Sequence, residues 1–421
     1  MTATGLVESM TKASTAEGRR RGIRWSVWLL GIAGMLVLVS IVRLITGAND
    51  ITSSGTTGAA LRLAVPIGLA GLGGLWAERS GVVNIGLEGQ LILGTWFGAW
   101  GAYEFGAWWG VVVGIIGGAL GGLILAVATV TFGVDHIVAG VAVTILGAGI
   151  TRFLSALIFV DTPGGGVTQS PSLPRIDTVT LPGSEALRTL EDKHWFVVSD
   201  VAGVLGGLVT QVSLLTIVAV LLLPATYFLL WRTKFGLRLR SCGEAPGAAE
   251  TLGVNVYRFK YTAVILSGGF AGLGGAFLSL VATNIYREGQ TNGRGYIGLA
   301  AMIFGNWMPG GLALGSGIFG YTDALQLRSG GQSVHALLLL LAIVLALLAG
   351  WSLYRGKRLR AAISLAVAAG ALVWYLTTDT VPDEFVGFAP HLTTLLVLAL
   401  AAQRLRPPAA DGKPYRRGEA G

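Results

Sequence analysis

Five polar side chains stand close together between two apolar runs near residue 80. The stretch 78–90 reads E-R-S-G-V-V-N-I-G-L-E-G-Q, and its polar members are Glu78, Arg79, Asn84, Glu88 and Gln90. If the flanking runs lie in a membrane, such groups are costly there and usually face protein or a water-filled cavity that passes a polar solute. The other interpretation is an ordinary surface turn, with Glu78 and Arg79 in water. The residue types alone leave both interpretations open.

A second polar break interrupts an apolar run at Asn306-Trp307, before Met308-Pro309-Gly310. An aromatic ring beside an amide can contact a purine or pyrimidine ring, and it can equally be an interfacial tryptophan anchor followed by a turn. We predict a transport pathway lined by polar groups from both breaks: Asn84, Glu88, Gln90, Asn306 and Trp307. For three further charges, snorkelling or internal pairing is favoured over a place in the pathway: Arg62, Arg152 and Asp323.

The remaining reactive side chains form no catalytic or metal-binding pattern. The histidines are scattered without the spacing of metal ligands: His136, His194, His335 and His391. The single cysteine, Cys242, excludes an internal disulfide and argues against a multi-cysteine metal site. Residues 71–74 contain three glycines, but no Lys-Ser/Thr follows and no strand precedes them, so they are not a phosphate-binding loop. We expect a protein that is not an enzyme and has no metal or cofactor of its own.

The composition indicates that both polar breaks lie in a membrane protein. The 421 residues are 53% hydrophobic and 12% charged, with a mean hydropathy of +0.68, whereas soluble domains carry roughly 25% charged residues. Lipid must be the outer solvent of such a chain, and backbone groups in lipid are satisfied only within helices or closed barrels. The apolar runs are long and do not alternate, which favours helices. The predicted fold class is an all-α polytopic membrane protein.

About twelve apolar segments are predicted to be membrane helices: 25–45, 59–76, 83–103, 108–132, 135–159, 211–231, 261–282, 296–308, 310–327, 334–354, 359–377 and 391–403. Short loops rich in Lys and Arg stay in the cytoplasm. Such residues cluster in four places: 19–24, 232–260, 355–360 and 404–417. Six, four and two segments separate these clusters, so all four lie on one side of the membrane. Because each of these numbers is even, both termini are predicted to be cytoplasmic. The net charge of +8 then reflects orientation in the membrane rather than nucleic-acid binding.

The chain then divides into a basic cytoplasmic segment at 1–24, a transmembrane domain at 25–404 and a cytoplasmic tail at 405–421. The polar loop at about 160–210 is expected outside the cell, with one short helix near residues 184–190. The loop at about 232–260 is expected inside the cell. It contains an alanine-rich piece, 244–252, which is predicted to be helical and to end at Gly253.

Many of the 64 glycines lie within apolar runs, where small residues let membrane helices approach closely. Two ladders have a spacing of four: Gly110, Gly114, Gly118 and Gly122, and then Gly268, Gly272 and Ala276. We interpret them as packing seams, with sliding surfaces during transport as the alternative. The sequence Ala-Gly-Leu-Gly-Gly occurs at 70–74 and again at 271–275, and Ile-Gly-Leu follows each copy. This repetition has two possible explanations, an inverted repeat of the fold or a chance similarity between glycine-rich helices.

Several stretches together resemble one transporter family. Residues 78–89 are similar to the E-R-x-G-x-x-N-I-G-x-E-G motif of permeases in the branched-chain amino acid/ribose superfamily of ABC importers, closest to its nucleoside (basic membrane protein-dependent) branch. The matching signature positions are Glu78, Arg79, Gly81, Asn84, Gly86, Glu88 and Gly89. The similarity continues at 243–254, at 296–307 and in the tail at 406–415. It covers most of residues 59–327 and the tail.

The resemblance implies a membrane-spanning permease subunit of an ATP-binding-cassette importer, built on a core of about ten spans. Residues at about 334–377 would then be an added helical pair, and the external loop is longer than usual. The helix within 232–260 would be the coupling helix, which transmits ATP-driven closure of a cytoplasmic ATPase to the spans. A merely solvated connector is the alternative. The candidate contacts are Glu244, Ala248, Ala249 and Gly253.

The resemblance also implies partners and a cargo. ATP would be bound by the separate ATPase subunit, and the other partners would be a second related permease, an extracytoplasmic substrate-binding lipoprotein, membrane lipid and a small-molecule solute. Nucleosides would enter by alternating access across the cytoplasmic (plasma) membrane. One alternative is the same machine with a simple sugar or a branched-chain amino acid as cargo. Another is a secondary transporter driven by an ion gradient, which needs a buried proton or sodium site.

Overall fold

The computed structural model describes residues 25–382 and 405–418, and helices make up most of these ranges. Their only sheet pairs β1 (Thr178–Val179) with β2 (Val212–Ser213) in antiparallel fashion, with Thr178 opposite Ser213. The predicted all-α class is confirmed. The predicted basic segment, 1–24, and the predicted last span, 391–403, lie outside the described residues.

Most of the apolar segments form helices close to their predicted bounds. These helices are α2 (Trp25–Thr46), α3 (Ser54–Arg79), α4 (Leu87–Phe105), α5 (Ala107–Ala126), α6 (His136–Ile158), α9 (Leu214–Arg232), α12 (Val256–Phe277), α13 (Arg294–Phe304), α14 (Pro309–Tyr354) and α15 (Arg358–Thr377). Within the described ranges, seven helical segments are long and apolar enough to cross a membrane: Ser54–Arg79, Ala107–Thr131, His136–Ile158, Leu214–Arg232, Val256–Ala282, Gly331–Tyr354 and Arg358–Thr377. Three shorter apolar helices accompany them: Ala33–Thr46, Val198–Val209 and Arg294–Phe304. The chain is thus built to cross a membrane several times.

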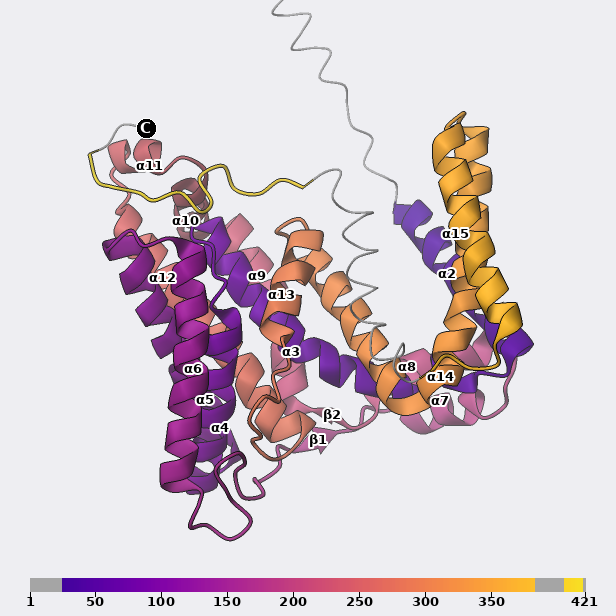
Figure 1. The fold of residues 1–421 in the computed structure, drawn as a ribbon, viewed down its shortest axis with the longest axis horizontal. Coiled ribbons are helices and arrows are strands. Elements are labelled where there is room, and N and C mark those ends of the chain that lie inside the picture. Colours follow the sequence, from indigo (N-terminus) through magenta and orange to yellow (C-terminus); the bar gives the residue numbers. More distant parts are fainter. Residues whose placement is uncertain (1–24, 383–404, 419–421) are drawn as a thin grey trace, which may run out of the picture.

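Helix α14 joins two segments that the sequence predicts as separate spans, 310–327 and 334–354. It is helical over 46 residues, but Figure 1 shows that it runs away from α13 and then turns back beside α15. Its sequence contains Ser329-Gly330-Gly331, residue types at which long helices bend. The chain therefore still changes direction where the break was predicted. The second part of α14 packs along α15, and the interpretation of this pair as an addition to a ten-span core stays a prediction.

Four short helices lie between the long ones. The polar loop at about 160–210 contains the predicted helix, α7 (Ser184–Glu191), and a second one that was not predicted, α8 (Val198–Val209). The loop 232–260 contains α10 (Lys234–Glu244), which was not predicted, and α11 (Pro246–Thr251). Helix α11 is the predicted alanine-rich helix. It begins at Pro246 because proline fits the first turn of a helix, and it is followed by Gly253 at φ +80°.

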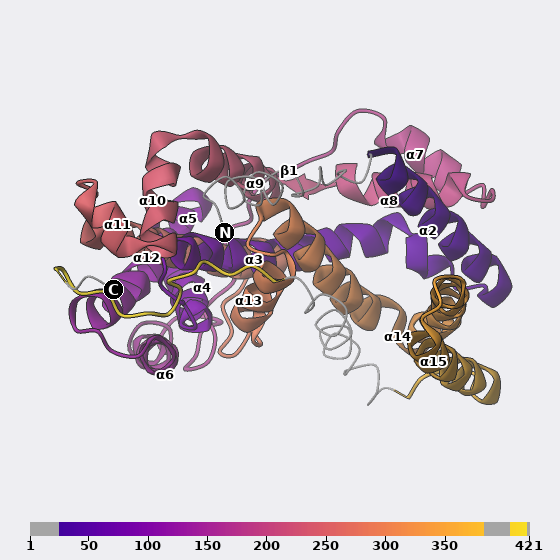
Figure 2. The ribbon, with the colours of Figure 1, turned by 90° about the horizontal axis from the view of Figure 1, so that it is seen from above.

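Helix α3 lies at the centre of the fold. Figures 1 and 2 show it crossing from the bundle of α4, α5, α6 and α12 to the side of the molecule that holds α2, α8 and α15. It packs against α12, α13 and α14. Gly73 allows the close approach of α3 to α12, because a Cβ atom there would stand 2.5 Å from the Ser267 carbonyl oxygen.

The two predicted small-residue ladders are confirmed as one packing seam. A Cβ atom on Gly118 of α5 would overlap the Gly268 carbonyl oxygen of α12, and one on Gly272 would overlap the Gly114 carbonyl oxygen. Helix α4 joins at the same level, where a Cβ atom on Gly94 would overlap the Gly272 carbonyl oxygen. Three backbones therefore meet in direct contact, which is how small residues hold membrane helices together.

Candidate functional site

The signature stretch forms a tight, buried turn between α3 and α4. The side chains of Glu78 and Glu88 are only 3% and 6% exposed, so the interpretation of this stretch as an ordinary solvated turn is wrong. Buried charges need partners. The partners come from three distant parts of the chain, and they make the signature residues the centre of a polar cluster.

Glu88 caps the start of α13. Its Oε1 accepts a 3.0 Å hydrogen bond from the backbone nitrogen of Gly293, and its Oε2 accepts a 2.7 Å bond from that of Gly295. The first amide groups of a helix have no partner within the helix, and the helix dipole favours a negative charge there. Gly295 allows this approach, because a Cβ atom on it would stand 2.5 Å from the Glu88 nitrogen. The carboxylate thus fixes the start of α4 to the start of α13.

Asn84 and Gln90 form a buried amide pair. The Asn84 Nδ2 group donates to Gln90 Oε1 at 2.9 Å and to Ser267 Oγ at 2.8 Å, and Gln90 Nε2 donates back to Asn84 Oδ1 at 3.4 Å. Both amides are fully buried. Their hydrogen-bonding groups are used within the protein, which ties the signature turn to α12.

Trp307 is held by the two charged residues at the end of α3. Its indole Nε1 donates a hydrogen bond to Glu78 Oε2. Its carbonyl oxygen accepts two bonds from the Arg79 guanidinium, at 3.2 Å and 2.8 Å. Asn306 and Trp307 both have φ of +54°, a left-handed conformation that side chains rarely adopt without support. The structure gives Trp307 that support through α3.

The C-terminal tail reaches the same cluster. The Asn306 Oδ1 atom accepts a 2.8 Å bond from the nitrogen of Arg406. Further along, the carboxyl of Asp411 is largely buried beside that of Glu78. Burial raises the pKa of Asp411 to about 6, although its interactions with Glu78 and Gly412 act the other way. Two ionised carboxylates side by side repel each other, so protonation of Asp411 favours attachment of the tail to α3.

The predicted coupling residues begin directly beside this cluster. Gly243 of α10 lies so close to the signature turn that a Cβ atom would overlap the Arg79 carbonyl oxygen, and Gly81 faces it at φ +85°. Glu244 pairs with Arg79 at 3.9 Å and accepts a 3.2 Å bond from the nitrogen of Ala409. The loop 232–260 and the signature turn are therefore one packed unit.

Helix α11 presents one face to the protein and another to solvent. Ala249 is 2% exposed and packs inward, whereas Ala248 is exposed. Glu250 accepts a 2.6 Å hydrogen bond from the Tyr415 hydroxyl and pairs with Arg417 at 3.3 Å. The Tyr415 bond, with smaller help from Gly418 and Arg417, lowers the pKa of Glu250. Glu250, Asp411 and Tyr415 were not predicted as site residues, although they lie in the stretches 243–254 and 406–415 that carry the family resemblance.

The two remaining signature glycines serve packing against α6. A Cβ atom on Gly89 would stand 2.5 Å from Thr144 Cα, and one on Gly86 would stand 3.3 Å from Val143 Cβ. Two of the three charges for which internal pairing was favoured are paired: Arg152 with Glu288 and Asp323 with Arg294, both at 3.5 Å. Their internal pairing is confirmed. Arg62 has no such partner among the described ion pairs and donates to the Gly58 carbonyl oxygen at 3.3 Å.

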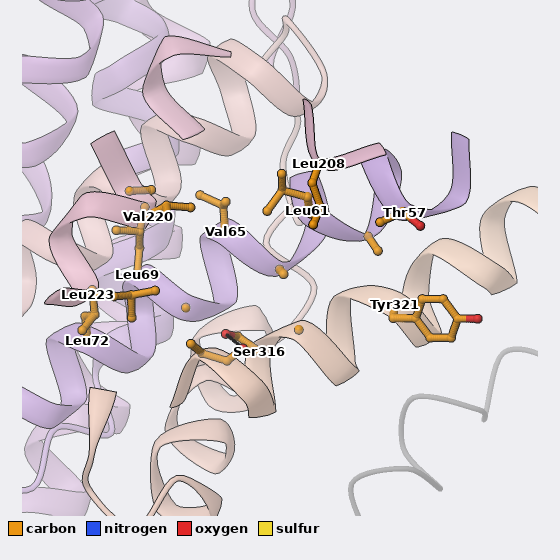
Figure 3. Close-up of a pocket in the computed structure, with 16 residues that line it drawn as sticks. Thr57, Leu61, Val65, Leu69, Leu72, Leu208, Val220, Leu223, Ser316 and Tyr321 are labelled. Atoms are coloured by element: carbon orange, nitrogen blue, oxygen red, sulfur yellow. Dashed lines mark hydrogen bonds between the residues drawn. The ribbon is translucent and has the colours of Figure 1, made fainter. Parts of the chain in front are cut away.

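A cavity of about 350 Å³ lies beside residues 57–72 of α3, on the N-terminal side of Glu78 and Arg79, and we call it the chamber. In Figure 3, Leu61, Val65 and Leu69 project from α3, while Val220 comes from α9 and Ser316 from α14. Most of the lining is apolar; its polar side chains are those of Thr57, Ser316 and Tyr321.

A second hollow of about 140 Å³ shares Leu61 with the chamber, and we call it the vestibule. Its lining is mixed, and its polar side chains come from the first part of α3 and from the segment that leads into α9: Ser54, Arg62, Thr210, Gln211, Ser213 and Thr216. None of the five residues predicted to line a transport pathway borders either hollow. Those five residues belong to the polar cluster, and their contact with a solute stays a prediction.

The chain is similar to a known family over most of its length. A family model described as "Branched-chain amino acid transport system / permease component" matches residues 56–347. The guanosine ABC transporter permease protein NupQ of Bacillus subtilis is 33% identical over 370 residues, which cover 86% of this chain and 96% of that protein. The nucleoside ABC transporter permease protein NupC of Lactococcus lactis is 30% identical over 362 residues, or 83% and 93% of the two chains.

A third relative is named for a different solute. A protein of Haloferax volcanii, provisionally named as the glucose ABC transporter permease protein TsgC13, is 34% identical over 283 residues, which cover 67% of this chain and 80% of that protein. No solved structure has a significant match to the chain. The relatives are permease subunits of ABC transporters, a class of subunit that is not itself an enzyme.

The family model spans well over half of the chain, and the range that it matches includes the signature turn, the loop 232–260 and the chamber. The helices long enough to cross a membrane fall largely within the same range. The chain is a multi-pass membrane protein, and it belongs to the family of branched-chain amino acid transport system permease components.

Proposed function

We propose that this chain is the membrane-spanning permease subunit of an ABC importer that carries nucleosides into the cell. The observation that carries the proposal is the near end-to-end similarity to two relatives named for guanosine and nucleosides, which are covered over 96% and 93% of their lengths. The glucose-named relative matches a smaller share of this chain, so a sugar is the second candidate cargo. A branched-chain amino acid is supported by the description of the family and by a relative named for that cargo, which matches only 26% of this chain.

The subunit would work with three partners. A cytoplasmic ATPase would dock on α11, where Ala248 is exposed. Just before α11, at the end of α10, Glu244 pairs with Arg79 of α3. A second, related permease would complete the membrane part, and an extracytoplasmic lipoprotein would deliver the solute. ATP would be bound by the ATPase, and this chain would carry no cofactor. The basic clusters support a plasma-membrane orientation with both termini in the cytoplasm.

Transport would follow alternating access. The ATPase would push on α11, and α10 would pass the movement to the signature turn, since Gly243 and Glu244 both contact it. From there Glu88 and Trp307 lead to α13 and to the start of α14. In this proposal, Asn84, Glu88, Gln90, Asn306 and Trp307 serve the pathway by positioning the helices that surround it.

The test is uptake of radiolabelled guanosine, glucose and leucine by cells with and without this gene, in a strain that lacks other nucleoside transporters. Guanosine uptake should disappear on deletion while the other two persist. It should also disappear in Ala248→Arg, with the protein still in the membrane, because the bulky cation blocks the exposed face of α11. The matched control is Thr189→Arg on the exposed external helix α7, which should retain uptake. Guanosine uptake that is unchanged by deletion would refute the cargo.

A further inference from the structure

We propose that the chamber between α3, α9 and α14 is the solute-binding site of this subunit and that the vestibule is its entrance. The ligand class is a neutral solute with a flat, largely apolar ring and several hydroxyl or amide groups. This inference rests on the proposed function, which makes the ligand a nucleoside. It assigns binding to residues outside the signature motif.

The chamber has the size and chemistry of a small-molecule site. Sites for small ligands are commonly about 300–1,000 Å³, mainly apolar, with a few placed polar groups. The chamber is about 350 Å³, with Thr57 and Ser316 hydroxyls in an otherwise apolar wall. The Ser316 hydroxyl donates to the Leu312 carbonyl oxygen of its own helix at 2.8 Å, so its proton is used within the helix and its oxygen is left as an acceptor. Gly317 leaves room, because nothing lies within 4 Å of where its Cβ atom would stand.

Arg62 gives the vestibule a charged donor. It is exposed and lies within a helix that is long and apolar enough to span the membrane. Its Nε donates to the Gly58 carbonyl oxygen at 3.3 Å, and no carboxylate in the described ranges pairs with it. An ionisable side chain inside a span marks a solute pathway when structure does not neutralise it. Its remaining N–H groups can bind the carbonyl or hydroxyl oxygens of an entering solute.

Two prolines supply acceptors at the same walls. Pro66 lies inside α3 and Pro224 inside α9, and a proline has no N–H to bond the carbonyl four residues earlier. Those carbonyls belong to Arg62, which lines the vestibule, and Val220, which lines the chamber. Helical carbonyls freed in this way are tolerated in a membrane where another donor satisfies them. The hydroxyl and amide groups of a nucleoside are such donors.

Helix α3 connects this site with the polar cluster. The vestibule and chamber occupy its residues 54–72, and Glu78 and Arg79 end it. At 1.5 Å per residue, its 26 residues make a rod about 39 Å long. One continuous helix therefore bears the solute site at one end and contacts the coupling loop at the other, so movement of the loop reaches the bound solute.

The test uses cysteine labelling in membranes that contain the complete transporter. The native thiol, Cys242, gives a low background because it is buried and burial raises its pKa to about 11, whereas only thiolates react. Gly317→Cys places a thiol in the chamber. The matched control is Ile318→Cys, the neighbouring position, which is 44% exposed, points about 100° away around the helix and does not line the chamber.

The reagent is a charged methanethiosulfonate, which reacts with thiols that contact water. We expect it to label Gly317→Cys, and guanosine at about ten times its Kd to slow that labelling about ten-fold. Labelling of Ile318→Cys should not respond to guanosine. Protection by ribose or leucine in place of guanosine would support the chamber and overturn the nucleoside cargo. Absence of labelling, or labelling that no solute slows while guanosine uptake is intact, would overturn the chamber.

A blocking variant provides a second readout. Gly317→Phe fills the chamber, and guanosine uptake should fall to background at an unchanged amount of membrane protein. The matched control is Gly370→Phe on α15, where a Cβ atom also meets nothing within 4 Å, and its uptake should equal that of the native chain. Full uptake by Gly317→Phe would contradict the proposal.

Discussion

The hydroxyl of Tyr415 donates a 2.6 Å hydrogen bond to Glu250 Oε2 and so ties the C-terminal tail to the proposed coupling helix α11. The Tyr415 ring also lies 5.4 Å from that of Tyr257 at the start of α12. A backbone bond from Ala410 to the Gly243 carbonyl oxygen, 2.9 Å long, continues the attachment along α10. The tail is therefore a strap across the surface on which the proposed ATPase would dock.

Removal of the tyrosine hydroxyl should loosen this strap. In Tyr415→Phe the ring remains, but Glu250 loses the hydroxyl donor and keeps Arg417 and the Gly418 nitrogen. We expect faster hydrogen–deuterium exchange at the amides of residues 409–411 and a lower rate of guanosine uptake. The matched control is Tyr354→Phe at the exposed end of α14. Exchange that is unchanged in Tyr415→Phe would show that the bond does not hold the tail.

Attachment of the tail should also depend on pH through Asp411. Its pKa is raised from 3.8 to about 6 by burial, so the attached state favours the protonated carboxyl. The stabilisation is complete below 3.8 and is lost as the pH rises to about 6. The groups that face Asp411 are Glu78, Arg79 and Lys260. Hydrogen exchange of the tail, corrected for intrinsic rates, should therefore increase across this range.

The variant Asp411→Asn separates this effect from other titrations. Its amide cannot ionise, so the tail should stay protected to the same degree on both sides of pH 6. Increasing exchange with the native pH dependence in Asp411→Asn would assign the titration to another group.

Loss of the α13 cap should destabilise the fold. In Glu88→Ala the amides of Gly293 and Gly295 lose their acceptor, and a buried group left without its partner costs about 1–3 kcal/mol. We expect a lower thermal midpoint for the purified protein in detergent, with partial recovery in Glu88→Gln. The control is Glu104→Ala, an exposed acid at the other end of α4. Equal midpoints for the two alanine variants would contradict the capping role.

The glycine seam should tolerate no side chain. In Gly118→Ala the new methyl group would overlap the Gly268 carbonyl oxygen, and extra atoms in a packed core cost about 1–3 kcal/mol or more. We expect less folded protein and a lower thermal midpoint. Gly370→Ala, where the added atom meets open space, is the control. A native midpoint in Gly118→Ala would mean that the seam is loose.

Local patterns in the sequence predicted the helices well, because apolar runs, Pro246 and Gly253 act on their neighbours along the chain. Helices α8 and α10 escaped prediction for the opposite reason. Helix α8 is short and lies in a polar loop, where its buried Asp200 is satisfied by Arg43, Ser40 and Thr52. Helix α10 is rich in basic residues, and it is held by contacts with the signature turn that only the folded chain reveals.

The residue types in the sequence predicted where the polar site lies, but they did not predict which residues its side chains contact. The buried polar stretch 78–90 was recognisable from residue types, yet Glu78 meets Trp307 across 229 positions of sequence. An even longer separation from Glu78 concealed Asp411, whose acidic side chain gives no sign of burial in a polar tail. The chamber could not be predicted, since leucines, valines and glycines line it and look like ordinary span residues.

The most direct test of the central claim is guanosine uptake into proteoliposomes that contain this chain, its partner permease and its ATPase, with the lipoprotein added outside. We predict that radiolabelled guanosine accumulates only when ATP is present on the ATPase side, and that Ala248→Arg abolishes the accumulation while Thr189→Arg does not. Accumulation driven by a proton or sodium gradient without ATP would contradict the account and identify a secondary transporter.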